Sequence, residues 1–229
     1  MILILLYALM AQSWNVVAGL SGQISLGQAI FFGIGAYSST VLFAKYGITP
    51  WAGLMVGMLL SALAAVAIGV PTLRLRGHYF AIATLLIGSS VQIVFQRWDW
   101  VGAASGLYVP IERASPWFYL QFHTSKVPYY YLALGWAIGL GCVGIAGSML
   151  SSFYYIFPEV GVNFALLAFV AVALGGFGSI LGSLLAGVLI GLVESLGGLL
   201  LDPSYKTLIV FGLYLGVVIV RPNGLFGRF

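Results

Sequence analysis

The side chains that could do chemistry in this chain are mainly uncharged and polar, and they lie inside strongly apolar sequence. Gln12 and Asn15 are three residues apart, so on a helix they share one face, and Ser89 and Gln92 do the same. Such faces can replace water around the ammonium and carboxylate of a zwitterionic solute. They can equally form hydrogen bonds between membrane helices, which contribute only ~0.6 kcal/mol on average. The spacing leaves both interpretations open.

A polar segment punctuated by glycine separates two apolar runs near the N-terminus. It carries Gln23, Ser25 and Gln28, and it lies between the apolar stretches 1–14 and 29–43. At membrane depth, irregular backbone persists only where protein or a water-filled cavity satisfies its polar groups. A broken helix with these side chains therefore indicates a solute path.

A second break, rich in glycine and serine, spans residues 175–183 and interrupts the apolar run 163–200. Paired breaks in two halves of a chain are typical of a central transport site. Glu194 is the only acid deep within a predicted span, and such carboxylates are often functional. It could instead be a neutral or hydrogen-bonded glutamate near a helix end. The candidate pathway residues are Gln12, Asn15, Gln23, Ser25, Gln28, Thr84, Ser89, Gln92, Ser179 and Glu194.

Catalytic and metal chemistry are not indicated. No arrangement of nucleophile and base is visible, and no Walker phosphate loop is present, so we expect neither an enzyme nor an ATP site. Cys142 and two distant histidines, His78 and His123, are too few to hold a metal ion, and we expect no cofactor.

Composition restricts the fold class. Of 229 residues, 62% are hydrophobic and only 6% are charged, whereas a soluble domain carries about 25% charged residues. A water-soluble protein is excluded, and the segments of alternating polarity expected of an outer-membrane barrel are absent. The net charge of +4 comes from scattered basic residues, which argues against nucleic-acid binding.

We predict an all-α, polytopic transmembrane helical bundle of about seven to eight spans with glycine-rich broken helices, forming a single domain over 1–229. Gly187 and Gly191 form a small-residue pair suited to close helix packing. The apolar segments are 2–19, 28–44, 51–73, 79–96, 129–150, 163–181, 183–200 and 205–220. The connection 97–128 is rich in aromatic residues and is either an interfacial loop or a docking surface for an external partner.

Motifs along most of the chain resemble the membrane permeases of branched-chain amino acid ABC importers. In the first half, 14–37 and 73–85 resemble the LivM-type permease. In the second half, 144–147, 174–180 and 221–227 look more like the LivH-type permease. We accordingly divide the permease domain into a LivM-like part, 1–128, and a LivH-like part, 129–229.

This resemblance implies a multi-pass permease subunit in the bacterial inner membrane, surrounded by lipid and passing a small amino acid. It also implies ATP-binding cassette subunits, a second permease subunit and a periplasmic substrate-binding protein as partners. Within the same family, the solute could instead be urea or a short amide. The sequence is also compatible with a truncated or fused chain without driven transport, and with a channel-like pore in which Glu194 is the selectivity residue.

One expected feature is missing. The family's cytoplasmic loop that docks onto the ATPase subunits should lie between Tyr129 and Gly144, but the sequence there is continuously apolar. The resemblance also implies a further span upstream of Met1.

The positions of the basic residues also indicate that this cytoplasmic loop is missing. The basic loop at Arg74 and Arg76 and the basic tail at Arg221 and Arg228 are both expected to be cytoplasmic, yet five predicted spans separate them. Either 129–150 is a fused remnant of two spans, or one later segment does not cross.

Overall fold

The computed structural model describes residues 2–21, 24–75, 77–109, 149–152, 154–200, 205–221 and 224–226. The elements are α1 (Ile2–Ser21), α2 (Gln28–Tyr46), α3 (Pro50–Thr72), α4 (His78–Arg97), η1 (Asp99–Val101), η2 (Ala103–Ser105), α7 (Val160–Gly175), α8 (Ile180–Leu200) and α9 (Lys206–Val220). Within these described ranges there is no strand, only an isolated bridge between Leu107 and Ile156. The predicted all-α class is confirmed.

Most of the predicted apolar segments correspond to helices. The segment 129–150 lies outside the described residues except for its last two, which are helical. Among the residues that the structure describes, three helical stretches are long and apolar enough to cross a membrane: Pro50–Thr72, His78–Arg97 and Ile180–Gly197. Val160–Gly175 and Thr207–Val220 are shorter apolar helices. The chain is a helical membrane protein, and its number of spans stays a prediction.

The second break is shorter than the sequence predicts. α7 ends at Gly175 and α8 already begins at Ile180, so Ser183, which we expected in the break, is helical. Gly176 and Gly178 have φ values of 96° and 81°. This left-handed conformation favours glycine and ends a helix, which confines the break to a tight turn.

The chain forms two compact units. Of the described residues, the first contains those up to 21 and those from 166 onward, with α1, the end of α7, α8 and α9. The second contains those in 24–109 and 149–165, with α2, α3, α4 and the start of α7. The division at residue 128 into LivM-like and LivH-like parts rests on resemblance alone and stays a prediction.

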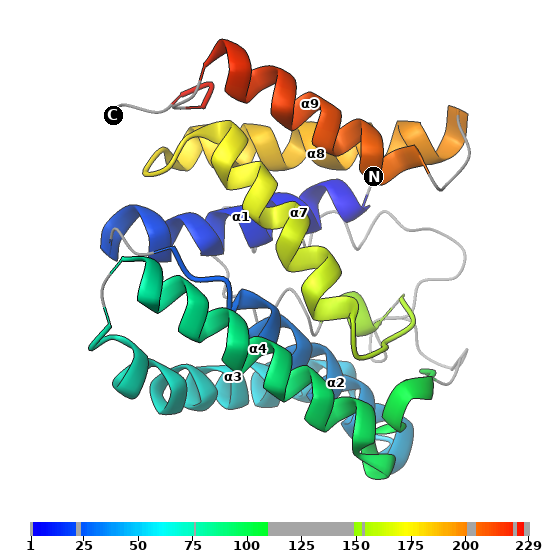
Figure 1. Ribbon diagram of the computed structural model, residues 1–229. Coiled ribbons are helices and arrows are strands. Elements are labelled where there is room, and N and C mark those ends of the chain that lie inside the picture. The colour runs from blue at the N-terminus through cyan, green and yellow to red at the C-terminus, as the bar shows by residue number, and fades with distance from the viewer. Residues whose placement is uncertain are drawn as a thin grey trace. The chain divides into compact units, whose positions relative to one another are not determined.

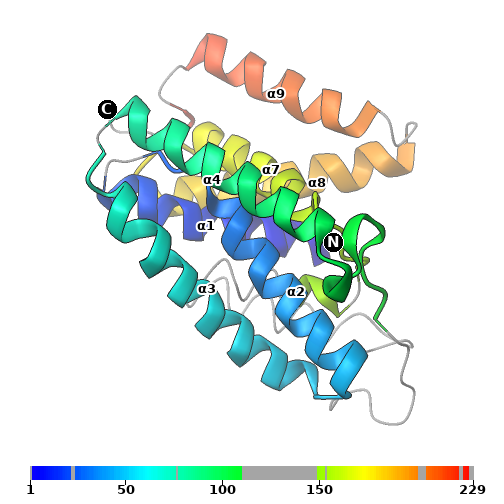
Figure 2. The same cartoon turned by 60° about the horizontal axis from the view of Figure 1, so that its bottom comes forward.

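In the first unit, α1 lies along α8, and α9 packs against α8 (Figures 1 and 2). A Cβ atom at Gly187 would lie 2.6 Å from the Cα of Ala8, and one at Gly191 would lie 2.4 Å from the Cα of Ile4. Only glycine permits this backbone approach, which confirms the packing role predicted for the pair.

In the second unit, α2 packs on α3, where the Ser61 hydroxyl donates to the carbonyl oxygen of Phe31 at 2.9 Å. The opposite side of α3 is apolar yet exposed, as lipid contact requires. The exposed apolar residues there include Leu59, Leu63, Val66 and Val70.

Exposed aromatic side chains gather after α4. Trp98 and Trp100 are about half exposed, and the Lys45 ammonium lies 4.6 Å from the centroid of the Trp100 ring and donates to the Trp100 carbonyl oxygen. This mixture suits the membrane interface, as predicted for the start of the 97–128 connection. Residues 110–128 lie outside the described residues, and a docking role stays a prediction.

Candidate functional site

The first break, in the second unit, is held by a side chain from α4. The backbone N–H of Leu26 donates to Thr84 Oγ1 at 3.1 Å, and that of Gly27 donates to Ser25 Oγ at 3.3 Å. Ser25, Gln28 and Thr84 are buried. The Thr84 side chain therefore satisfies irregular backbone that would otherwise be costly inside a membrane.

The position of Thr84 shows how deep this break lies. Thr84 is six residues beyond His78, the first residue of α4, which is about 9 Å along the helix axis. The N-terminus of α2 thus begins beside the interior of α4 rather than at its end. The predicted break in the helix is confirmed for residues 24–27. Gln28, which we expected in the break, is instead the first residue of α2, and Gln23 lies outside the described residues.

The second break, in the first unit, is held by α1. Asn15 Oδ1 accepts from the backbone N–H of Gly178 at 2.9 Å, and Gln12 Nε2 donates to the carbonyl oxygen of Ile180 at 2.9 Å. Ser179 begins α8 as a cap, because its hydroxyl accepts from the Gly182 N–H at 3.1 Å.

The face shared by Gln12 and Asn15, which the spacing predicts, therefore forms hydrogen bonds to the α7–α8 turn. Both side chains are almost completely buried. Of the two interpretations left open, the structure shows interhelical hydrogen bonding for these residues, and a role in a solute path stays a prediction.

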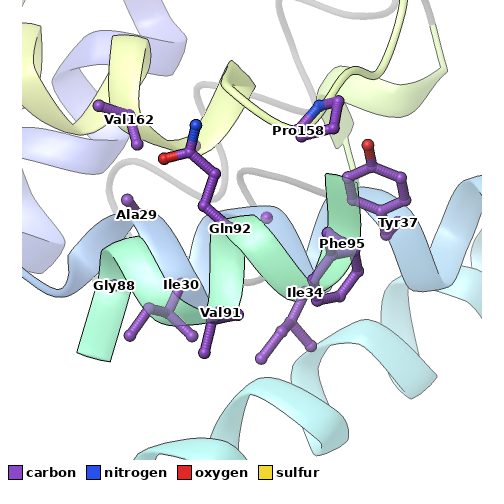
Figure 3. Close-up of a pocket in the computed structure, with 12 residues that line it drawn as sticks. Ala29, Ile30, Ile34, Tyr37, Gly88, Val91, Gln92, Phe95, Pro158 and Val162 are labelled. Atoms are coloured by element: carbon purple, nitrogen blue, oxygen red, sulfur yellow. The ribbon is translucent and has the colours of Figure 1, made fainter. Parts of the chain in front are cut away.

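A small open hollow lies in the second unit between α2, α4 and the start of α7. The space inside it is about 30 Å³, which is room for about two water molecules. Figure 3 shows Gln92 extending from α4 toward Val162, with the Tyr37 hydroxyl turned toward the side of Pro158. The lining residues are Ala29, Ile30, Gly33, Ile34, Tyr37, Gly88, Val91, Gln92, Phe95, Pro158, Gly161 and Val162.

The sequence analysis did not single out Tyr37, which lines this hollow, or Glu159, which directly follows the lining residue Pro158. Tyr37 is 3% exposed, and its hydroxyl oxygen has no hydrogen-bond partner among the described residues. Glu159, which immediately precedes α7, accepts from Gln96 Nε2 at 2.5 Å. The sequence signal for Glu159 was its position between Pro158 and an apolar helix, where an acid at a helix N-terminus is favourable.

The remaining candidates are separate from the hollow's lining. Ser89 is exposed, and its hydroxyl donates to the carbonyl oxygen of Leu85 at 3.1 Å. Of the predicted pair Ser89 and Gln92, Gln92 lines the hollow and Ser89 does not. Glu194 is partly buried on α8 in the first unit. Within the described parts of the chain, no group of three His, Cys, Asp or Glu side chains can hold a metal ion.

The sequence matches a family described as the permease component of the branched-chain amino acid transport system, over residues 1–140 and 127–218. These regions include most of the chain. The chain belongs to this family. The resemblance that its motifs indicate is thereby confirmed.

Three relatives in the family have names that include high-affinity branched-chain amino acid transport. LivH of Escherichia coli K12 is 37% identical over 110 residues, which is 48% of this chain and 34% of LivH. LivM of the same organism is 42% identical over 92 residues, which is 40% of this chain and 22% of LivM. BraD of Pseudomonas aeruginosa is 37% identical over 98 residues, 42% of this chain and 32% of BraD.

The matched stretches thus span about a third or less of these relatives' own lengths. No solved structure matches the chain.

Proposed function

We propose that this chain is a permease subunit of a bacterial ABC importer for branched-chain amino acids, and that it forms the solute pathway while separate subunits hydrolyse ATP. Family membership over residues 1–140 and 127–218 carries this proposal. The proposed partners are ATP-binding cassette subunits, a second permease subunit and a periplasmic substrate-binding protein. The proposed location is the bacterial inner membrane, which the chain crosses several times, and the chain itself is not an enzyme.

The geometry of the second unit supports a pathway. The N-terminus of α2 begins beside the interior of α4, and next to it lies a hollow with an apolar wall and a few polar groups. Transporters bind small solutes at such interrupted helices, because the ends of helices inside the membrane offer unpaired backbone groups.

A second candidate is a permease-like chain without driven transport. It is favoured by the continuously apolar sequence 131–144, where the family's ATPase-docking loop is expected. A third is a permease of the same family for urea or short amides.

Reconstitution separates these candidates. The chain is co-purified with the ATPase, permease and binding-protein subunits of the same organism, placed in proteoliposomes, and assayed for ATP hydrolysis and labelled leucine uptake. We expect leucine to stimulate both, and an ATPase subunit with its catalytic glutamate replaced to abolish both. Failure of the subunits to co-purify, without any leucine-stimulated hydrolysis, would favour the undriven chain. Stimulation by urea but not by leucine would favour the third candidate.

A further inference from the structure

The hollow in the second unit is closed in this structure to anything larger than water. Its inner space of about 30 Å³ has room for about two water molecules. Figure 3 shows two of its lining residues on different elements, Phe95 on α4 and Pro158 just before α7. A larger molecule can enter only if the elements around the hollow move apart, so their attachments to one another decide how it opens.

The contact between α2 and α7 is too closely packed to open easily. A Cβ atom at Gly161 of α7 would lie 2.4 Å from the carbonyl oxygen of Ala29 of α2, so the two backbones are in direct contact. About one turn further along both helices, the rings of Phe32 and Phe164 stack with their centroids 5.3 Å apart. Separating α2 from α7 would therefore break up a close-packed interface.

The end of α4 is instead attached by a hydrogen bond between side chains. Gln96 Nε2 donates to Glu159 Oε1 at 2.5 Å. Gln96 directly follows the lining residue Phe95, and Glu159 directly follows the lining residue Pro158. This bond therefore joins the α4 wall of the hollow to the segment that leads into α7.

The segment after α4, which we call the strap (residues 98–108), makes a second attachment to the same place. The backbone N–H of Leu107 donates to the carbonyl oxygen of Ile156 at 2.9 Å, in an isolated antiparallel bridge. Next to this bridge, the rings of Tyr108 and Tyr155 stack with their centroids 4.2 Å apart. The strap thus fastens the C-terminal end of α4 to the segment before α7.

Two features of the closed state are unfavourable. Ala103, in the strap, has a φ of 47°, which residues other than glycine adopt at a cost in strain. The Tyr37 hydroxyl oxygen is buried at the hollow without a hydrogen-bond partner among the described residues. Release of the strap would relieve the strain at Ala103, and entry of water would satisfy the Tyr37 hydroxyl. The closed state therefore depends on the attachments that the strap and Gln96 make.

We propose that the strap and the Gln96–Glu159 bond form a latch, which opens the hollow by letting α4 move away from the segment before α7. Opening breaks the Gln96–Glu159 bond and the bond between Leu107 and Ile156, while α2 and α7 stay packed. This proposal goes beyond the proposed function, because it concerns access to the hollow whatever solute the chain carries.

The accessibility of a cysteine placed in the hollow tests the latch. Gly33 lines the hollow, and nothing lies within 4 Å of a Cβ atom added there, so Gly33→Cys fits the closed state. The native Cys142 is removed by Cys142→Ser. The full chain in mixed micelles is treated with a water-soluble methanethiosulfonate reagent, and mass spectrometry of the peptide that carries residue 33 gives the modification rate. The rate follows the fraction of open molecules, because the reagent is larger than the closed hollow.

Breaking the latch should speed this modification. Gln96→Leu removes the donor to Glu159 and should raise the rate about 10-fold or more, since the lost bond is to a charged group. Glu159→Gln keeps an acceptor for Gln96 and should raise it less. Ser90→Ala is the matched control on the same helix, because the exposed Ser90 hydroxyl bonds only to the Leu86 carbonyl oxygen of α4, and it should leave the rate unchanged.

Locking the latch should reverse the effect. Residues opposite each other in an antiparallel bridge lie within the Cα distance that a disulfide spans, so Leu107→Cys and Ile156→Cys can be joined by oxidation. In the Gln96→Leu chain, oxidation of this pair should return the rate to that of the parent chain.

An unchanged rate in Gln96→Leu, an equal rise in Ser90→Ala, or a rate that oxidation does not lower overturns the latch. If Gln96→Leu does not yield folded protein, comparison of the oxidised and reduced pair in the parent chain decides alone. These rates are measured without transport, so their failure leaves the proposed function standing, and failure of reconstituted uptake leaves the latch standing.

Discussion

The two glycine-rich breaks have similar sequences but are held differently. Each is bound by a polar side chain about 9 Å inside a neighbouring helix. Thr84 lies six residues after the start of α4, and Asn15 lies six residues before the end of α1. In both cases the side chain satisfies a backbone N–H that cannot bond within a helix.

The second break is much more firmly bound. Besides Gln12 and Asn15, the segment after α9 attaches to it, because the N–H of Leu225 donates to Leu174 at 2.8 Å and that of Phe226 to Gly175 at 3.1 Å. In the described part of the first break, residues 24–27, the side chains of Thr84 and Ser25 bind the backbone. The second break is therefore a structural joint, and we expect the first to be less rigid. The similar glycine-rich sequences of the two breaks therefore do not imply similar roles.

The largest expected effect comes from adding one methyl group to the joint. A Cβ atom at Gly175 would lie 2.4 Å from the backbone of Gly182, which cannot move without shifting α8. Gly175→Ala should lower the free energy of unfolding by about 2–3 kcal/mol, measured by denaturant titration in mixed micelles. Gly27→Ala, in the first break, meets Thr84 only at 3.2 Å and should cost less.

Gly216→Ala on α9 is the matched control, since nothing lies within 4 Å of its added Cβ atom. Its free energy of unfolding should stay within about 1 kcal/mol of that of the wild-type chain. If Gly27→Ala destabilises as much as Gly175→Ala, the two breaks do not differ in rigidity.

An intermediate effect is expected from removing one side-chain partner of each break. Asn15→Leu leaves the Gly178 N–H unpaired, and Thr84→Val leaves the Leu26 N–H unpaired, at a cost of about 1–2 kcal/mol each. Amide hydrogen exchange should then rise only in peptides around 176–183 for the first variant and around 24–30 for the second. Faster exchange at both breaks in either variant would show that they open together.

The smallest effect is expected at Gln12. The Gln12 Oε1 atom is buried without a partner among the described residues. The Ile180 carbonyl oxygen, to which Gln12 Nε2 donates, also accepts from the Ser183 hydroxyl at 3.1 Å. Gln12→Leu should therefore change the free energy of unfolding by less than about 0.5 kcal/mol, because the lost bond is offset by removal of an unpaired acceptor. A loss as large as that of Asn15→Leu would show that Gln12 is as important to the joint as Asn15.

Much of this arrangement could be predicted from local sequence. The three-residue spacing of Gln12 and Asn15 fixes a common helix face, and the glycines at 176 and 178 end α7 because few other residues adopt positive φ. Neither pattern reveals which backbone the side chains bind. Ser89 shows the limit of such reasoning. Its spacing from Gln92 predicts a shared polar face, but its hydroxyl donates to the Leu85 carbonyl oxygen of its own helix.

The sequence by itself determined the membrane class, the helices and the places where they break, because apolar length, helix periodicity and glycine conformation are local properties. Only the tertiary structure decided that Tyr37, Gln92 and the segment around Glu159 meet at one hollow. Residues this far apart in the chain come together through helix packing, and a single sequence carries no local signal for such contacts.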